Sequence, residues 1–263
     1  MIAKIWKELL VLVALFAGLW LAFSYYNYDV NRNPFEVSAK TEREMAEFMN
    51  DYMLQDFEFI HNKAADSTLQ VILERLTQNM DTVSYDYQLH IIKESQINAF
   101  TSLNGNIYIF SGLIEDLQSA EELALVLAHE IGHAEEKHVI EKIAKTLGME
   151  AFFSIATGGD PVLISELAKL SMSTAFDRRN EEEADDYALD LAEKSQINPR
   201  RLGQFFIRMK AKKSSIMDDL SFFSTHPLDS DRIKKASDYK ISDDFEEQPI
   251  PIDWERFQNL ISS

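Results

Sequence analysis

Residues 129–133 read His-Glu-Ile-Gly-His, and this run constrains the fold more than any other feature of the sequence. On an α-helix, His129 and His133 lie on one face, about one turn apart, so both imidazoles can bind one tetrahedral zinc ion. Glu130 projects to the side, where it can accept a proton from a reacting water. Two histidines that fall at this spacing by chance are the alternative, and further ligands are needed to exclude it.

The flanking sequence predicts a helix around this motif. Residues 119–122 read Ser-Ala-Glu-Glu, a capping-box pattern in which the serine oxygen accepts from a backbone amide and the last glutamate reaches back. Residues 123–128 are all apolar, as is typical of a helix buried on most sides. Gly132 keeps the helix slim, so we expect another element to pack closely there.

A catalytic zinc ion needs a third protein ligand. Glu181 and Asp185 are again four residues apart, so one helical face carries two carboxylates. The first can bind the metal, and the second can accept a hydrogen bond from a ligating histidine and fix its tautomer. Taken alone, this acidic run also fits a solvated helix start that the helix dipole favours.

Helical and strand-like patterns surround these motifs. Helices are predicted at about 41–62, 67–80, 152–157, 161–175, 180–193, 199–212 and 230–239, and strands at 85–92, 97–101 and 107–110. Residues 104–106 read Asn-Gly-Asn, a turn signal before the last strand. We expect an α+β fold, mainly α-helical, with a small antiparallel sheet packed beside the His-Glu-Ile-Gly-His helix.

The N-terminus has the composition of a membrane segment. Lys4 and Lys7 precede a run without charge over residues 9–23. An uncleaved anchor, a cleaved signal peptide and a buried core helix all remain open. In the first two cases the rest of the chain is exported, which in a Gram-negative cell means the periplasm.

Composition limits the partners of the chain. Its formal charge of −18 would repel phosphate backbones and no basic stripe compensates, so we expect no nucleic-acid partner. The absence of cysteine excludes disulfides, thiolate metal sites and a lipid-modified N-terminal cysteine. We divide the chain into an anchor or signal segment 1–24, a linker 25–40, a main folded domain 41–240 and an acidic tail 241–263, with Trp254 and Phe257 as docking anchors.

Three motifs together carry a family resemblance. His-Glu-Ile-Gly-His, then Arg-x-Asn-Glu-x-Glu-Ala-Asp about 50 residues later, then Ser-Thr-His-Pro-Leu-Asp-Ser-Asp-Arg-Ile, resemble the membrane-associated gluzincin metallopeptidases of the HtpX, BepA and Oma type. Residues 97–100 and 105–113 resemble the segment before that family's zinc helix. The resemblance covers roughly residues 65–240 and implies a zincin-like domain. Without several membrane spans or a helical repeat domain, the chain is most similar to short, exported, single-domain (minigluzincin-like) members.

The resemblance implies a role for each matching residue. One zinc ion per chain would be bound by His129, His133 and Glu181. Glu130 would be the general base, and Asp185 would support a ligating histidine. The sheet edge that pairs with an extended substrate would consist of four consecutive residues: Asn106, Ile107, Tyr108 and Ile109.

His226 matches a histidine that in BepA-like relatives can approach the zinc, where it takes the place of the water or steadies the oxyanion. The alternative is a histidine that only caps a turn before a proline. Arg178 and Arg232 are expected to form ion pairs that support the site, and a purely structural role is open for either. His138, one turn past the motif, is expected to be exposed and without function.

We therefore expect a zinc-dependent endopeptidase that cleaves unfolded or misassembled cell-envelope proteins. It would act in the periplasm, anchored to the inner membrane by its N-terminal segment or released if that segment is cleaved. A chaperone-like client-binding protein with a latched or inactive zinc site is one alternative. A zinc enzyme that acts on a small substrate, such as an aminopeptidase, is another.

Overall fold

The computed structural model describes residues 38–147, 175–213 and 222–262, together with the single positions 18, 162, 165, 166 and 169. The apolar segment 9–23, nearly all of the predicted linker and the predicted helices at 152–157 and 161–175 lie outside these residues, apart from a few positions. Within the described ranges, no helix combines the length and the apolar character that a membrane span requires. Residues from Ala39 onwards form a compact unit of their own.

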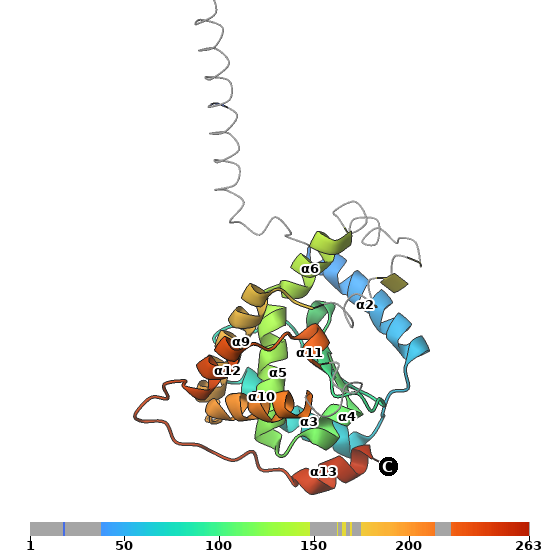
Figure 1. Ribbon diagram of the computed structural model, residues 1–263. Helices are drawn as coiled ribbons and strands as arrows, with labels where there is room; N and C mark the ends of the chain where they lie inside the picture. Colours follow the sequence, from blue (N-terminus) through green and yellow to red (C-terminus); the bar gives the residue numbers. More distant parts are fainter. Residues whose placement is uncertain are drawn as a thin grey trace, which may run out of the picture. The chain divides into compact units, whose positions relative to one another are not determined.

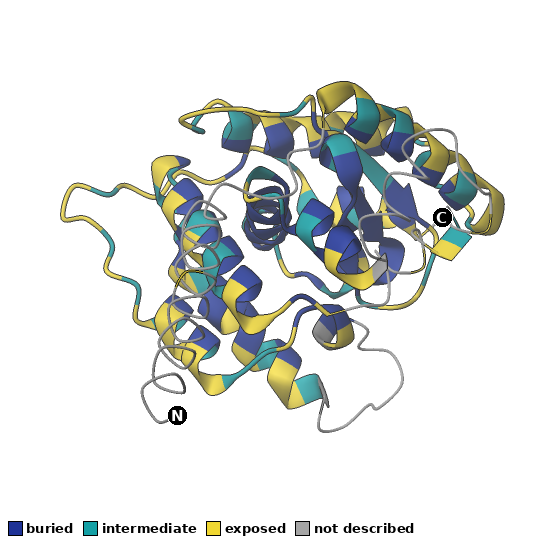
Figure 2. Cartoon of the chain, turned by 90° about the horizontal axis from the view of Figure 1, so that it is seen from above, coloured by how far each residue is buried: buried dark blue, intermediate teal, exposed yellow. Residues whose placement is uncertain are grey.

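Helix α5 (Ala120–Glu135) lies at the centre of this unit and is buried along almost its whole length; Figure 2 views it end-on. Its start follows the predicted capping pattern. The Ser119 hydroxyl accepts from the Glu122 amide at 3.4 Å, and the Glu122 carboxylate accepts from the Gln118 amide at 2.8 Å. This apolar, well-capped helix gives the metal motif a rigid support.

Helix α9 (Arg178–Lys194) packs directly on α5 (Figure 1). The Asp177 carboxylate caps it by accepting from the Asn180 amide at 3.0 Å. A Cβ atom at Gly132 would lie only 3.1 Å from both the Cα and the carbonyl oxygen of Ala184. The two helices therefore approach closely at the level of the motif, as the glycine predicted, and α9 brings its carboxylates to the histidines.

The sheet has the strand order β1 (Gln88–Ile92), β3 (Asn106–Phe110), β2 (Ala99–Thr101). Strands β2 and β3 are antiparallel as predicted, whereas β1 and β3 are parallel, so the prediction of an antiparallel sheet is wrong for that pair. The chain reverses between β1 and β2 and again at the tight turn η1 (Leu103–Gly105), where Asn104 and Gly105 have φ of 56° and 72°. Two reversals restore the direction of β1, and β3 inserts between the other strands.

The two faces of the sheet cover different cores. Ile107 and Ile109 belong to the main core with α5, while Phe100, Tyr108 and Phe110 form a smaller aromatic core with Met53 of α2. The remaining helices surround these layers: α2 (Ala39–Asp56), α3 (Lys63–Thr77), α4 (Ser111–Asp116), α6 (His138–Leu147), α10 (Arg200–Lys213), α11 (Phe222–Thr225), α12 (Ser230–Ser237) and α13 (Trp254–Ile261). The predicted class, α+β and mainly helical, is confirmed.

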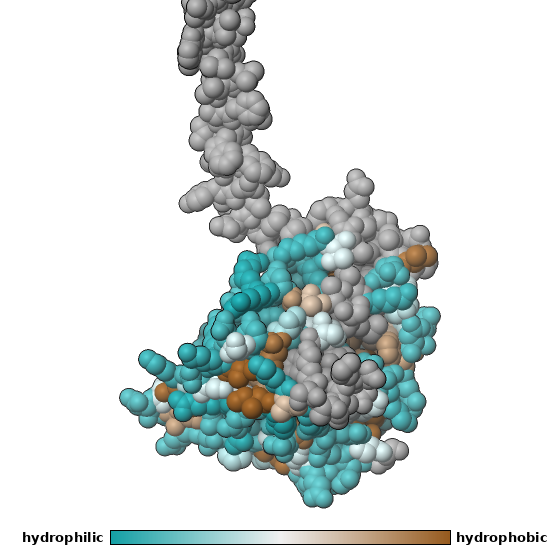
Figure 3. All heavy atoms as spheres, viewed as in Figure 1, coloured by the Kyte–Doolittle hydropathy of each residue, from teal (hydrophilic) through white to brown (hydrophobic). Residues whose placement is uncertain are grey.

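The predicted acidic tail contains helix α13, which packs on α3 and α4. Phe257 and Ile261 are buried in the main core, and the Trp254 indole donates to the Leu117 carbonyl at 3.1 Å. The end of the chain is thus part of the compact unit. The face seen in Figure 3 is mostly hydrophilic where it is coloured.

Candidate metal centre

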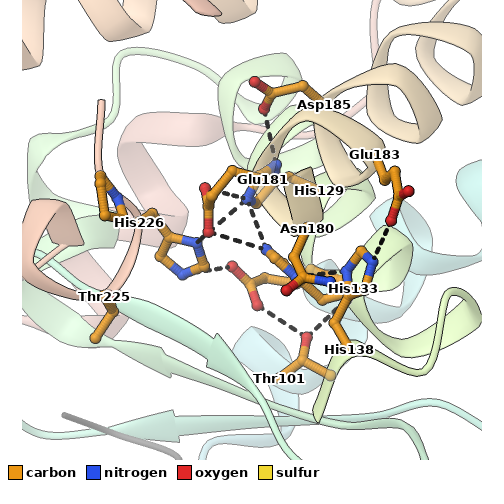
Figure 4. A network of polar contacts seen from close by, with 12 residues as sticks. Thr101, His129, His133, His138, Asn180, Glu181, Glu183, Asp185, Thr225 and His226 are labelled. Atoms are coloured by element: carbon orange, nitrogen blue, oxygen red, sulfur yellow. Dashed lines mark hydrogen bonds and ion pairs between the residues drawn. The ribbon is translucent and has the colours of Figure 1, made fainter. Parts of the chain in front are cut away.

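Four buried side chains from three parts of the chain converge beside α5 (Figure 4). His129 and His133 come from α5, Glu181 from the first turn of α9, and His226 from the segment after α11. Each is at most 2% exposed, and their candidate ligand atoms all lie within 4.8 Å of one another. Charged and basic groups are gathered in a region from which water is largely excluded, so a specific partner must compensate for their burial.

The spacing of these atoms suits a small cation. The Nε2 atoms of His129 and His133 are 3.1 Å apart. Glu181 places Oε2 3.6 Å from the first nitrogen and Oε1 3.5 Å from the second. Ligands bound to zinc at 2.0–2.1 Å in a tetrahedron lie about 3.3–3.4 Å from one another. The three groups therefore have nearly the separations that one tetrahedral zinc ion requires.

The protonation of the histidines fits the same interpretation. His129 Nδ1 lies 3.0 Å from a carboxylate oxygen of Asp185, which can only accept, so we assign the ring proton to Nδ1. Its Nε2 then presents a lone pair to the cluster. Burial lowers the pKa of His133 well below its usual value, so this ring is neutral near pH 7. Nitrogen lone pairs and a carboxylate repel one another at these distances, and a bound cation would turn this repulsion into attraction.

Arg232 pairs with two carboxylates of the site, those of Asp185 and Glu181. It binds Asp185 through two hydrogen bonds of 2.6 and 2.8 Å, and its Nη1 lies 2.6 Å from Glu181 Oε2. Burial alone would raise the pKa of Asp185, but the hydrogen bonds from Arg232 and His129 outweigh it and lower the pKa. Asp185 therefore stays ionised and keeps the His129 tautomer. Both residues lie where the sequence predicted supporting groups.

Arg178 lies elsewhere, and its predicted place in the site is wrong. Its side chain is 62% exposed and pairs with Glu182, Asp229 and Asp231 at the protein surface. None of these partners is a residue of the cluster. Arg178 is the first residue of α9, and its ion pairs join the starts of α9 and α12.

Glu130 is fully buried beside the cluster. The Thr101 hydroxyl lies 2.8 Å from Glu130 Oε2 and 2.7 Å from the Glu130 carbonyl oxygen. Glu130 Oε1 makes no hydrogen bond in the described part of the chain, although His226 Nε2 lies 3.4 Å from it. One carboxylate oxygen is thus fixed, and the other remains a proton acceptor. Sequence reasoning missed Thr101, which only the register of β2 brings to Glu130.

The His226 side chain lies inside the cluster rather than at a turn. Its Nδ1 is 3.0 Å from Glu181 Oε1 and 3.3 Å from His129 Nε2, and its Nε2 is 3.4 Å from Glu130 Oε1. The Phe222 ring stacks on it, with ring centres 4.8 Å apart. Burial would lower the pKa of His226, but the negative charges of Glu181 and Glu130 outweigh it and raise the pKa.

Phe176 covers the other side of the site. Its ring stacks on the His133 imidazole with centres 3.9 Å apart, and the Lys142 ammonium lies 4.2 Å from the centre of the Phe176 ring. Burial lowers the pKa of Lys142 to about 8, although Glu130 and Glu181 oppose this fall. An apolar wall next to a cation closes this end of the site, and no sequence pattern indicated either residue.

The predicted substrate-pairing strand is not an edge strand. Residues 106–109 belong to β3, which is bonded on both sides, to β1 and to β2. The Asn106 side chain lies 2.9 Å from His90 Nε2, and the Tyr108 hydroxyl lies 3.1 Å from Asn50 Oδ1. Ile107 and Ile109 point into the main core. The prediction is wrong because the parallel strand β1 occupies the edge of β3 that was expected to be open.

Comparisons with known proteins agree with this geometry. The chain matches Peptidase family M48 over residues 63–240. It is 29% identical to mitochondrial metalloendopeptidase OMA1 of Schizosaccharomyces pombe over 220 residues, which cover 80% of this chain and 64% of the relative. It is 24% identical to a β-barrel assembly-enhancing protease of Yersinia pestis over 213 residues, 76% of this chain and 44% of the relative.

A third relative is metalloprotease LoiP of Escherichia coli (strain K12), 28% identical over 186 residues, which cover 66% of this chain and 70% of the relative. Across these three proteins, the matched region therefore spans from less than half to about two thirds of the relative's length. The resemblance to this family that the motifs indicated is confirmed, while the exported, single-domain detail stays a prediction.

Proposed function

The chain belongs to Peptidase family M48, and on that basis we propose that it is a zinc-dependent endopeptidase that cleaves unfolded or misassembled proteins of the cell envelope. One observation carries the proposal: two buried imidazoles and a carboxylate have the separations of a tetrahedral site, and a second buried carboxylate, Glu130, stands beside them. A purely structural metal site would not need Glu130.

His129, His133 and Glu181 would hold the metal. When bound, zinc would polarise the scissile carbonyl and lower the pKa of a water molecule. The Thr101 hydroxyl holds Glu130 Oε2, so Oε1 is the oxygen left to take a proton from the attacking water. Glu130 then returns this proton to the leaving amine, which completes the hydrolysis of the peptide bond.

Strand β2 is the edge at which we propose that an extended substrate binds. Asn98 and Ser102 are bonded to β3 through their backbones, so by antiparallel alternation the backbone groups of Ala99 and Thr101 point to the opposite side. No hydrogen bond to those groups is found among the described residues. A peptide that pairs there would lie next to Glu130, because the Thr101 hydroxyl is 2.8 Å from Glu130 Oε2.

The location is part of the same proposal. The lysines at positions 4 and 7 and the uncharged run over residues 9–23 support export with an anchor in the inner membrane, or release into the periplasm after cleavage. Two bacterial relatives are named a β-barrel assembly-enhancing protease and a metalloprotease, and both names are in keeping with a protease.

Metal content and proteolysis test the proposal together. We expect one zinc ion per chain in the wild type and in Glu130→Gln, because Glu130 is not a ligand. The wild type should degrade an unfolded protein such as casein, and Glu130→Gln should be slower by about 10²–10⁴-fold. Retained turnover in the variant would refute the assigned role of Glu130.

The position of His226 favours a second candidate, a client-binding protein with a latched site. Its Nδ1 lies among the ligand atoms, where a fourth ligand would exclude water. Such a protein would bind unfolded casein without cleaving it, both as wild type and as His226→Ala. A latched peptidase would instead gain activity in His226→Ala, and a peptidase that uses His226 in catalysis would lose it.

A further inference from the structure

A chain of hydrogen bonds connects the metal cluster to the protein surface. His133 Nδ1 lies 3.0 Å from His138 Nδ1, and His138 Nε2 lies 3.0 Å from Glu183 Oε2 (Figure 4). His138 is 1% exposed, contrary to the expectation from the sequence, whereas the Glu183 side chain is 42% exposed. The other ring nitrogen of His133, Nε2, faces the cluster, so this series of hydrogen bonds ends at a residue that offers a candidate ligand atom.

When both rings are neutral, one arrangement of protons satisfies both contacts. A carboxylate can only accept, so Glu183 requires the proton of neutral His138 to be on Nε2. His138 Nδ1 is then an acceptor, and the short contact with His133 requires a proton on His133 Nδ1. His133 Nε2 is left with a lone pair for a metal. The opposite assignment would leave His138 Nε2 and Glu183 Oε2 as two acceptors 3.0 Å apart. It would also put a proton on His133 Nε2, which could then not bind a metal.

The local fold keeps the two rings in contact. Helix α5 ends after Glu135, and Lys137 adopts a left-handed backbone conformation with φ of 61° before α6 begins at His138. The reversal turns His138 back toward His133, with ring centres 5.1 Å apart, and the Phe176 ring packs against both. Water is excluded there, so it cannot replace the contact.

We propose that His138 and Glu183 are positioning residues of the metal site. Glu183 fixes the tautomer of His138, and His138 in turn fixes the tautomer and the ring orientation of His133. The inference rests on the metal site of the proposed function. It assigns to a half-exposed carboxylate control over a buried ligand, and neither residue touches the substrate or the metal.

The second ligating histidine is thus supported differently from the first. His129 is bonded directly to the buried carboxylate of Asp185, which Arg232 holds in place. For His133 the carboxylate is one imidazole further away and lies at the surface. Replacing Glu183 therefore alters the support of the ligand His133 without creating a cavity in the core, so a change in zinc affinity would not be due to lost packing.

The test is a titration of the full chain with Zn²⁺ against a competing chelator. Glu183→Ala should weaken zinc affinity about 10–100-fold, the usual effect of losing a partner behind a ligand. Glu182→Ala is the matched control, because it removes the same charge from the same helix, and Glu182 is 43% exposed and pairs with Arg178 instead. Its affinity should stay within about twofold of the wild type. Glu183→Gln should recover most of the loss, since an amide oxygen also accepts from Nε2–H.

Nitrogen NMR of the metal-free chain gives a second readout, which a merely structural role would not change. In the wild type, His133 should be protonated on Nδ1 and His138 on Nε2; Glu183→Ala should mix the two tautomers of both rings, and Glu182→Ala should not. Equal zinc affinities for the two alanine variants, with zinc bound to the wild type, would overturn the positioning role alone. A wild type that binds no zinc would overturn the proposed function as well.

Discussion

Replacing Arg232 by methionine should lower the free energy of unfolding of the domain more than almost any other single substitution. Arg232 is 2% exposed and neutralises two buried carboxylates, Asp185 and Glu181, and it also donates to the Pro227 carbonyl at 2.8 Å. Methionine retains much of the length of the side chain but none of the five donors. Two buried negative charges then lose their partner in a region that water does not screen.

The expected cost follows from this burial. Breaking a buried ion pair by removing one partner costs about 3–5 kcal/mol, because the remaining charge stays desolvated. For a domain of roughly 150–250 residues, each kcal/mol moves the melting temperature by about 2–4 °C. Arg232→Met should therefore lower the melting temperature of the metal-free protein by roughly 6–20 °C.

Thermal and urea unfolding of the metal-free chain measure this cost, with Arg178→Met as the control. Arg178 also forms several ion pairs, but at 62% exposure solvent screens them, so the stability of the control should stay close to that of the wild type. If the two variants lose the same stability, or if Arg232→Met loses less than about 1 kcal/mol, the argument from buried charge does not hold.

Other changes test single contacts. Thr101→Val removes the hydroxyl that steadies Glu130, and steady-state kinetics should show kcat/KM about tenfold lower, the equivalent of one hydrogen bond of about 1.4 kcal/mol; an unchanged value would exclude a role for this contact. Gly132→Ala pushes a methyl group against the backbone of Ala184, so it should displace α9 and weaken zinc binding in the chelator assay. Burial raises the pKa of Asp177, but the hydrogen bond from the Asn180 amide and the charge of Lys145 lower it overall. Its stabilisation is therefore complete above the pKa of an unfolded aspartate and lost as the pH falls through the lower folded value, and Asp177→Asn should lack this loss in urea unfolding between about pH 5 and 2.

The residues of the cluster were predictable where helical spacing alone decides geometry. His129 and His133 share a face of α5, and Glu181 and Asp185 share a face of α9, because residues four apart are neighbours on any helix. The capping pattern at residues 119–122 placed the first helix correctly. What spacing does not give is which helices meet, and that step came from the family resemblance and from Gly132, where two backbones can touch.

The sheet shows where local patterns stop. The strands at 88–92, 99–101 and 106–110 were each expected from alternating and β-branched residues, and the Asn-Gly turn predicted the antiparallel pair β2 and β3. Whether β1 joins on the far side of β3 depends on long-range pairing, which leaves no local signal. The strand that the family resemblance implied to be the substrate-pairing edge is therefore the central one, and β1 and β2 lie at the edges of the sheet.

His138 shows the same limit at the site itself. On an uninterrupted helix, a residue five positions beyond His133 points about 140° away from it, so a solvent-facing position was the reasonable expectation. The helix is interrupted, however: the positive φ of Lys137 ends α5 and starts α6 at His138, and the ring returns to its neighbour. A non-glycine residue in this conformation costs energy, which the buried His133–His138 contact and the packing of Phe176 can offset. The break in the helix is thus what allows Glu183 on α9 to act on a ligand of α5, and a sequence in which the helix continued would have no such connection.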